Sequence, residues 1–262
     1  MPRLRSLLRP DRFLRLAFLR RFLRAVWDLL RSCSSYPGRA RYRRLKGCLA
    51  ASRLDAPDGP RSTASPDLEA ADPDLITLKI SLLGDRRTGK TSFMIKYVGD
   101  GEGHTGLQEA GLNSMDKILF VRGARIAFSI WDVGGDDHSL NHMPEVCKGA
   151  VALLIMFDLT NRSTLNNAIG WFQRARNWNK TAVPVLVGTK FDEFVQLPLE
   201  MQWTIVNQAR AYARAMKATL FFSSANHNIN VNKIFKFIAA KLFNLPWSLE
   251  RNLTVGEPII DF

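Results

Sequence analysis

Cysteine is scarce in this sequence. The 262 residues include three cysteines, Cys33, Cys48 and Cys147. They are widely spaced and odd in number, so they provide neither a disulfide framework nor the paired spacing of a zinc site. The composition therefore excludes a small disulfide-stapled domain and indicates a reducing compartment.

Long apolar runs are also absent. The longest, "AVALLIMF" at residues 150–157, is far shorter than the roughly 20 residues needed to span a bilayer. The N-terminus has no uninterrupted apolar core of the secretory type. Residue 2 is proline and the final "GEPIIDF" holds no cysteine box, so we expect neither a lipid anchor nor a transmembrane segment. We expect a cytoplasmic protein, with the nucleus, a membrane surface or the spindle as alternatives.

Acidic residues are few in one part of the chain only. Residues 1–55 contain 15 of the 37 lysines and arginines but only three of the 24 acidic residues, a net charge of +12. The remainder carries 22 basic and 21 acidic residues, a net charge of +1. The overall charge of +13 therefore belongs to the N-terminal segment. It indicates no specific nucleic-acid partner for the rest of the chain.

Composition divides the chain into four segments. We predict a basic amphipathic arm at residues 1–50, a disordered linker rich in Ala, Ser, Pro and Asp at 51–74, a globular domain at 75–247 and a tail at 248–262. Within the arm, "FLRRFLRAVWDLLR" places apolar side chains on one helical face and arginines on the other. Three interpretations fit residues 12–31: binding to an anionic membrane, docking to a calmodulin-like partner, or organellar targeting.

From residue 75 onward, strand-like and helix-like segments alternate. The order β-α-β-β-α-β-α-β-α-β-α predicts an α/β fold with an open, mostly parallel, six-stranded sheet and helices on both faces. In such a fold the ligand binds at the carboxyl ends of the strands. The predicted strands are residues 75–84, 116–121, 125–131, 150–158, 183–190 and 219–225. The predicted helices include residues 90–98, 163–178, 200–216 and 231–243.

The stretch "GDRRTGKT" matches the phosphate-loop pattern G-x-x-x-x-G-K-[ST], with a predicted strand before it and a predicted helix after it. Main-chain N–H groups at the start of such a helix attract a phosphate. Lys90 can bridge two phosphate groups, and the Thr91 hydroxyl can bind Mg²⁺. The residues expected to surround the phosphates are Gly84, Asp85, Arg86, Arg87, Thr88, Gly89, Lys90, Thr91 and Ser92.

Three further motifs follow predicted strands: "WDVGGD" at 131–136, "GTKFD" at 188–192 and "SSA" at 223–225. Together with the phosphate loop they resemble the Ras-like small GTPases. Over residues 75–262, "ARIAFSIWDVGGD", "QARAYARAM" and "NLTVGEPIIDF" look most like the septum-promoting GTPases of fungal mitotic-exit signalling and their plant relatives. The resemblance implies binding of GTP or GDP with Mg²⁺, a GTPase-activating protein, and an effector protein kinase of a mitotic-exit or Hippo-like cascade.

The resemblance also assigns roles to residues beyond the phosphate loop. Asp132 would hold Mg²⁺ through water, with Thr91 as the other metal-binding residue. Asp192 would accept hydrogen bonds from guanine, a pattern that adenine does not match. Thr189 stands where most of the family has asparagine, and its hydroxyl can still form a hydrogen bond. The residues expected to complete the nucleotide site are Gly135, Lys190, Ser224, Ala225 and Asn226.

Several positions depart from the family pattern and concern turnover. The expected catalytic set is Lys90, Gly135 and Asp136, but Asp136 replaces the glutamine that usually orients the attacking water. We therefore expect slow intrinsic hydrolysis. The Mg²⁺-binding threonine of the first switch loop falls at Glu109 or Ala110, with Thr105 nearby but out of register.

Arg86 and Arg87 also stand where relatives carry small or neutral side chains. Either both arginines point to solvent, or Arg86 lies over the γ-phosphate. The sequence thus favours a GTP-dependent molecular switch in cell division. The alternative is a pseudo-GTPase scaffold that holds nucleotide constitutively.

Overall fold

The computed structural model describes residues 40–44, 75–99, 111–121, 124–244 and 249–262. The predicted arm helix, the linker at 51–74, and Thr105, Glu109 and Ala110 lie outside these residues. Among the described helices, none is long and apolar enough to cross a membrane.

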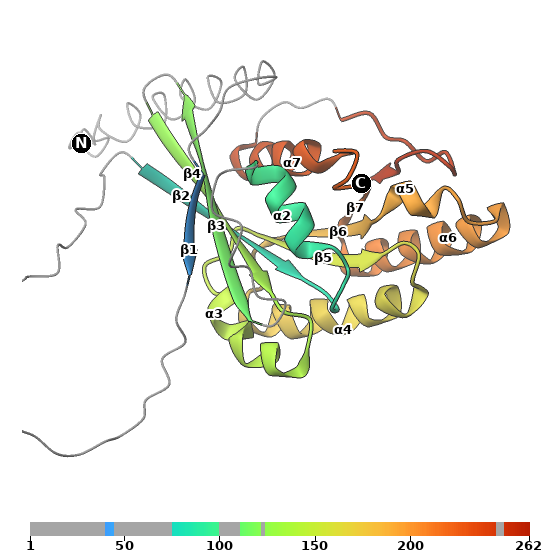
Figure 1. The fold of residues 1–262 in the computed structure, drawn as a ribbon, viewed down its shortest axis with the longest axis horizontal. Helices are drawn as coiled ribbons and strands as arrows, with labels where there is room; N and C mark the ends of the chain where they lie inside the picture. The colour runs from blue at the N-terminus through green and yellow to red at the C-terminus, as the bar shows by residue number, and fades with distance from the viewer. Residues whose placement is uncertain (1–39, 45–74, 100–110, 122–123, 245–248) are drawn as a thin grey trace, which may run out of the picture.

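One twisted sheet organises the described chain (Figure 1). Its strand order is β1-β3-β4-β2-β5-β6-β7-β8. The strands from β4 to β7 across this order are parallel, and β1, β3 and β8 pair in antiparallel fashion. The bounds are β1 Ala40–Arg44, β2 Leu75–Leu83, β3 Leu112–Val121, β4 Ala124–Val133, β5 Ala152–Asp158, β6 Val183–Thr189, β7 Thr219–Phe222 and β8 Ile260–Asp261.

All six predicted strands are present, and the mostly parallel α/β arrangement is confirmed. Two strands are additional: β1 pairs with β3 at one edge and β8 pairs with β7 at the other. Neither has the alternating or continuous apolar pattern by which strands are recognised, because β1 reads "ARYRR" and β8 has only two residues. β3 also begins at Leu112, four residues before the predicted start at 116.

Helices cover both faces of the sheet, as predicted (Figure 1). α2 and α7 lie on one face, where Phe93 and Tyr97 stack on Phe235. α3, α4 and α6 lie on the other face, with Leu165 and Val206 in a second apolar cluster. The bounds are α2 Lys90–Val98, α3 Met143–Cys147, α4 Arg162–Trp178, α5 Phe191–Phe194, α6 Leu199–Met216 and α7 Val231–Phe243, with a 3-10 turn at Asp137–His142.

The central strands bring the predicted motifs to one edge of the sheet. β5 is buried along its whole length because helices pack on both of its faces. The phosphate loop follows β2, Asp132 lies near the end of β4, and Thr189 ends β6. Ser223 follows β7. Since these strands are parallel, their carboxyl ends meet and form one site.

Candidate functional site

The phosphate loop depends on two glycines. Gly84 has φ 149°, and a Cβ added there would lie 2.1 Å from the carbonyl oxygen of Met156. Only glycine fits such a position. Gly89 precedes α2 with φ 83° and offers no side-chain cap to the first turn of the helix. The first N–H groups of α2 are therefore free of side-chain competition for an anion.

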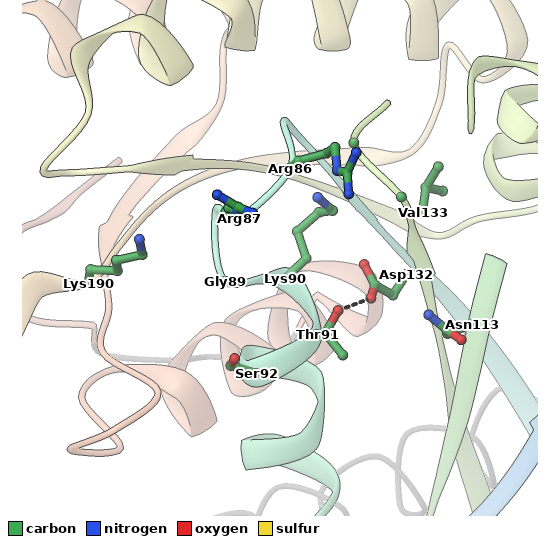
Figure 2. A pocket seen from close by; sticks show the side chains of 12 residues that line it. Arg86, Arg87, Gly89, Lys90, Thr91, Ser92, Asn113, Asp132, Val133 and Lys190 are labelled. Atoms are coloured by element: carbon green, nitrogen blue, oxygen red, sulfur yellow. Dashed lines mark hydrogen bonds between the residues drawn. The ribbon is translucent and has the colours of Figure 1, made fainter. Parts of the chain in front are cut away.

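Lys90 lies beneath the loop and is 5% exposed. Its Nζ donates hydrogen bonds to the main-chain oxygens of Gly84 at 2.9 Å and Asp85 at 2.7 Å. Burial lowers the pKa of Lys90, while the carboxylates of Asp132, Asp85 and Asp136 act in the opposite direction. The loop thus holds this ammonium in place from its own main chain, next to the pocket (Figure 2).

Asp132 faces Lys90 from the end of β4 and is 2% exposed. Its Oδ2 accepts a hydrogen bond from the Thr91 hydroxyl at 2.5 Å, drawn as a dashed line in Figure 2. Its Oδ1 is buried and has no hydrogen-bond partner. Burial raises the pKa of Asp132, while Lys90, Thr91 and Asn113 act to lower it. A buried carboxylate oxygen without a donor is costly, so the pair Asp132 and Thr91 fits a hard cation such as Mg²⁺.

Asn113 is a site residue that the sequence reasoning missed. It lies on β3 directly opposite Asp132 in the antiparallel register, is 7% exposed, and helps to lower the pKa of Asp132 against the effect of burial. It also lines the pocket. Counting back across the predicted hairpin turn at 122–123 would have placed it opposite Asp132. The polar "LNS" segment, however, did not resemble a strand.

Two adjoining cavities form the site. The larger, of about 360 Å³, is lined by Arg86, Arg87, Gly89, Lys90, Thr91, Ser92, Asn113, Asp132, Val133, Gly134, Gly135 and Lys190. The smaller, of about 170 Å³, is lined by Gly89, Ser92, Phe93, Thr189, Lys190, Asp192, Glu193, Ser223, Ala225 and Asn226. They share Gly89, Ser92 and Lys190, so they lie next to each other. Of the predicted residues, Gly84, Asp85, Thr88 and Ser224 line neither cavity.

Thr189 directs its hydroxyl to the main chain. Its Oγ1 lies 2.6 Å from the carbonyl oxygen of Thr88 and 2.9 Å from that of Phe157. Since a hydroxyl has one proton, it donates to one of these two oxygens at a time. Thr189 therefore ties the end of β6 to the phosphate loop.

Asp192 presents a carboxylate in the smaller cavity. Its Oδ2 accepts a hydrogen bond from the Asn226 side-chain amide at 3.1 Å. Partial burial raises the pKa of Asp192, but hydrogen bonds from Ser224 and Asn226 outweigh it, and the net pKa is lowered. The group is thus ionised at neutral pH and acts only as an acceptor. Such a group matches a ligand edge with two adjacent N–H donors.

Lys190 lies at the junction of the two cavities. Its Nζ pairs with the Asp158 carboxylate at 2.6 Å, and its backbone is left-handed with φ 56°. Arg87 has φ 59°. Non-glycine residues in this region are uncommon and cluster at functional sites. Both arginines of the loop, Arg86 and Arg87, are exposed and line the larger cavity.

Gly135 packs against the phosphate loop. A Cβ added at Gly135 would lie 2.1 Å from the main-chain nitrogen of Arg86 and 2.2 Å from the carbonyl carbon of Asp85. The segment after β4 can therefore approach the loop only because this residue has no side chain. Asp136 is the next residue, and its negative charge acts to raise the pKa of Lys90.

Comparison with known proteins agrees with this geometry. The model of the Ras family matches residues 79–244. The septum-promoting GTP-binding protein 1 of Schizosaccharomyces pombe is 47% identical over 187 residues, which cover 71% of this chain and 94% of that protein. The mouse Ras-related protein Rab-37 is 30% identical over 170 residues, which cover 64% of this chain and 74% of Rab-37. With a phosphate loop, an acidic residue near the end of β4 and a second acidic residue after β6 at one sheet edge, and with the family model matching residues 79–244, the chain belongs to the Ras family.

Proposed function

We propose that this chain is a guanine-nucleotide-dependent molecular switch that binds GTP and GDP together with Mg²⁺. The observation that carries the proposal is the pair of adjoining cavities at the carboxyl ends of the strands. The larger is lined by Lys90, with its ammonium, and by Asp132, with its unpartnered Oδ1, and the smaller by the ionised Asp192 carboxylate. These three groups complement a phosphate chain, a hard cation and a base edge with N–H donors.

Each part of the site has a distinct task. The N–H groups at the start of α2 and the Lys90 ammonium bind the phosphates. Mg²⁺, held by Thr91 and by Asp132 through water, neutralises phosphate charge when bound. Asp192 accepts from the ring N–H and amino group of guanine, while the Ala225 N–H donates to the guanine carbonyl. Adenine has no matching pair of donors there and would leave Asp192 unpaired, so guanine is favoured.

We propose slow intrinsic hydrolysis. Asp136 stands at the position of the water-orienting glutamine, is shorter, and adds negative charge near the phosphate-binding Lys90. Gly135 would offer its N–H to the terminal phosphate, and a GTPase-activating protein would supply the missing group. The alternative is a scaffold that retains nucleotide without useful turnover. Two features favour the scaffold. One is Asp136, and the other is that Glu109 or Ala110 stands where the family has its Mg²⁺-binding threonine.

The cellular role is proposed from the relatives. A protein that is 47% identical over 94% of its length is named for promoting septation and for binding GTP. We infer that this chain acts in cell division through an effector protein kinase of a mitotic-exit or Hippo-like cascade. Residues 1–50 would serve as a targeting or docking arm, 51–74 as a linker, 75–247 as the nucleotide-binding domain and 248–262 as its tail. The main location would be the cytoplasm.

The test is to identify the nucleotide carried by the purified full chain and to follow single-turnover hydrolysis of GTP. We expect bound guanine nucleotide, displaced by GTP or GDP but not by ATP, with slow turnover that a GTPase-activating protein accelerates. Lys90→Ala removes the buried ammonium and should abolish retention. Retention of ATP, or of no nucleotide, would contradict the proposal. Guanine nucleotide with no turnover under any condition would support the scaffold.

A further inference from the structure

Asp85 places a negative charge inside a loop that we propose to bind phosphate. It lies between Gly84 and Arg86, half-buried. Its charge is close enough to act on Lys90 and raise the pKa of that ammonium. A carboxylate turned toward the pocket would repel a phosphate and would compete with it for Lys90. The direction in which this side chain is held therefore matters for ligand binding.

Two side chains of α4 hold the Asp85 carboxylate. Trp171 Nε1 donates to Oδ1 at 2.7 Å, and Asn167 Nδ2 donates to Oδ2 at 2.8 Å. The two donors are four residues apart and so lie on the same face of the helix. Each carboxylate oxygen thus receives one donor from α4. We call this pair of hydrogen bonds the α4 contact.

The main chain of Asp85 is held from the pocket side. Its carbonyl oxygen accepts hydrogen bonds from Lys90 Nζ at 2.7 Å and from Thr88 Oγ1 at 2.9 Å. The peptide that joins it to Arg86 lies against Gly135. Asp85 therefore connects α4 on its side-chain end with the phosphate-binding ammonium on its main-chain end. A change in the side chain of Asp85 would therefore alter the position of the Lys90 ammonium.

We propose that Asn167 and Trp171 are positioning residues for the phosphate loop. The α4 contact holds the Asp85 carboxylate on the α4 side of the loop, so that the Lys90 ammonium is left for the nucleotide. Without the contact, the carboxylate turns toward Lys90 and competes with the phosphates. This inference rests on the proposed nucleotide binding. It goes beyond it by assigning a role in ligand retention to two residues of α4 that do not line the pocket.

The experiment measures release of a fluorescent GDP analogue from the full chain. Asn167→Ala combined with Trp171→Phe removes both donors but retains an aromatic ring in the core. We expect release about tenfold faster, equivalent to about 1.4 kcal/mol. Asn166→Ala is the matched control, because Asn166 is the neighbouring exposed residue and contacts Gln208 and Tyr212 instead. That control should release the analogue at the unaltered rate.

A third substitution separates positioning from general weakening of the fold. If the freed carboxylate is the cause, adding Asp85→Ala to the double variant should bring release close to that of Asp85→Ala alone. Fast release that persists after Asp85→Ala would overturn the inference, as would an unchanged rate in the double variant. Should the double variant fail to fold, Asn167→Ala alone, at an exposed position, gives the same comparison. No binding of the analogue by the unaltered chain would refute the proposed function itself, and this inference with it.

Discussion

At the scale of single residues, Thr189 shows how a departure from a family pattern can be accommodated. The sequence predicts that a threonine at this position can still form a hydrogen bond, but not with which partner. The hydroxyl reaches two main-chain oxygens, at 2.6 Å and 2.9 Å, which belong to the phosphate loop and to β5. The residue thus connects three segments of the site: the phosphate loop, β5 and β6.

Replacing Thr189 by valine should weaken both the fold and the site. Valine has the same shape but cannot donate, so it removes the one hydrogen bond that the hydroxyl gives to a buried carbonyl oxygen, at a cost of about 1–3 kcal/mol. We expect a lower free energy of unfolding in urea and faster GDP release. Thr189→Ser retains the hydroxyl and is the control. Equal unfolding midpoints for the valine and serine variants would contradict the role of the hydroxyl.

Asp132 is a residue of the site whose buried charge lowers the stability of the fold. It is 2% exposed, and one of its oxygens has no hydrogen-bond partner. Asp132→Asn replaces a buried charge by a neutral group of the same shape, which lowers the cost of burial. We expect the variant to be more stable than the unaltered chain in EDTA and to lose its response to Mg²⁺. Thermal unfolding with and without Mg²⁺ measures both, and a less stable variant in EDTA would refute the argument.

At the scale of elements, local patterns predicted most of the fold. The predicted bounds of α2 match the structure, and those of α4 differ by one residue at its start, because apolar periodicity and the phosphate-loop motif are local signals. The two edge strands and the role of Asn113 were not predicted. Nor was the α4 contact, which joins residues 82 and 86 positions apart. Contacts at that separation leave no local pattern.

β8 is anchored by side chains as well as by pairing. Ile259 is fully buried, and the Asp261 carboxylate accepts from Arg210 Nε at 2.9 Å and from Arg251 Nη2 at 2.5 Å. Burial raises the pKa of Asp261, but the hydrogen bonds and charges of both arginines outweigh it, and the net pKa is lowered. The stabilisation is therefore present above the unfolded value near 3.8 and is lost as pH falls through the lower folded value.

Asp261→Asn should accordingly destabilise the chain at neutral pH and not in strong acid. Because Arg251 is half exposed, we expect a loss of about 1–2 kcal/mol at pH 7. The difference from the unaltered chain should shrink as pH falls from the unfolded value near 3.8 through the lower folded value, because below both values Asp261 is protonated in either state. Urea unfolding at pH 7 and at pH 3 gives the two values. Glu257→Gln, at an exposed tail position, is the control, and an equal loss at both pH values would contradict the assignment.

At the scale of the whole molecule, the outermost strands of the sheet come from opposite ends of the described chain. β1 lies beside β3, with Arg44 opposite Asn113, and β8 lies beside β7. The six strands between them, β3, β4, β2, β5, β6 and β7, have neighbours on both sides. Within the described residues, the pocket therefore lies at the middle of a sheet whose two outermost strands are supplied by sequence outside the region that matches the Ras family.

The pairing of β1 with β3 has a consequence for recognition. A strand has only two sides, and β4 occupies the other side of β3. A partner that recognises this molecule by strand addition beside β3 must first displace residues 40–44. Such binding is then an exchange of one strand for another, and its net affinity is the difference between the two pairings. A partner of this kind would therefore have to pair with β3 more strongly than residues 40–44 of the basic arm do.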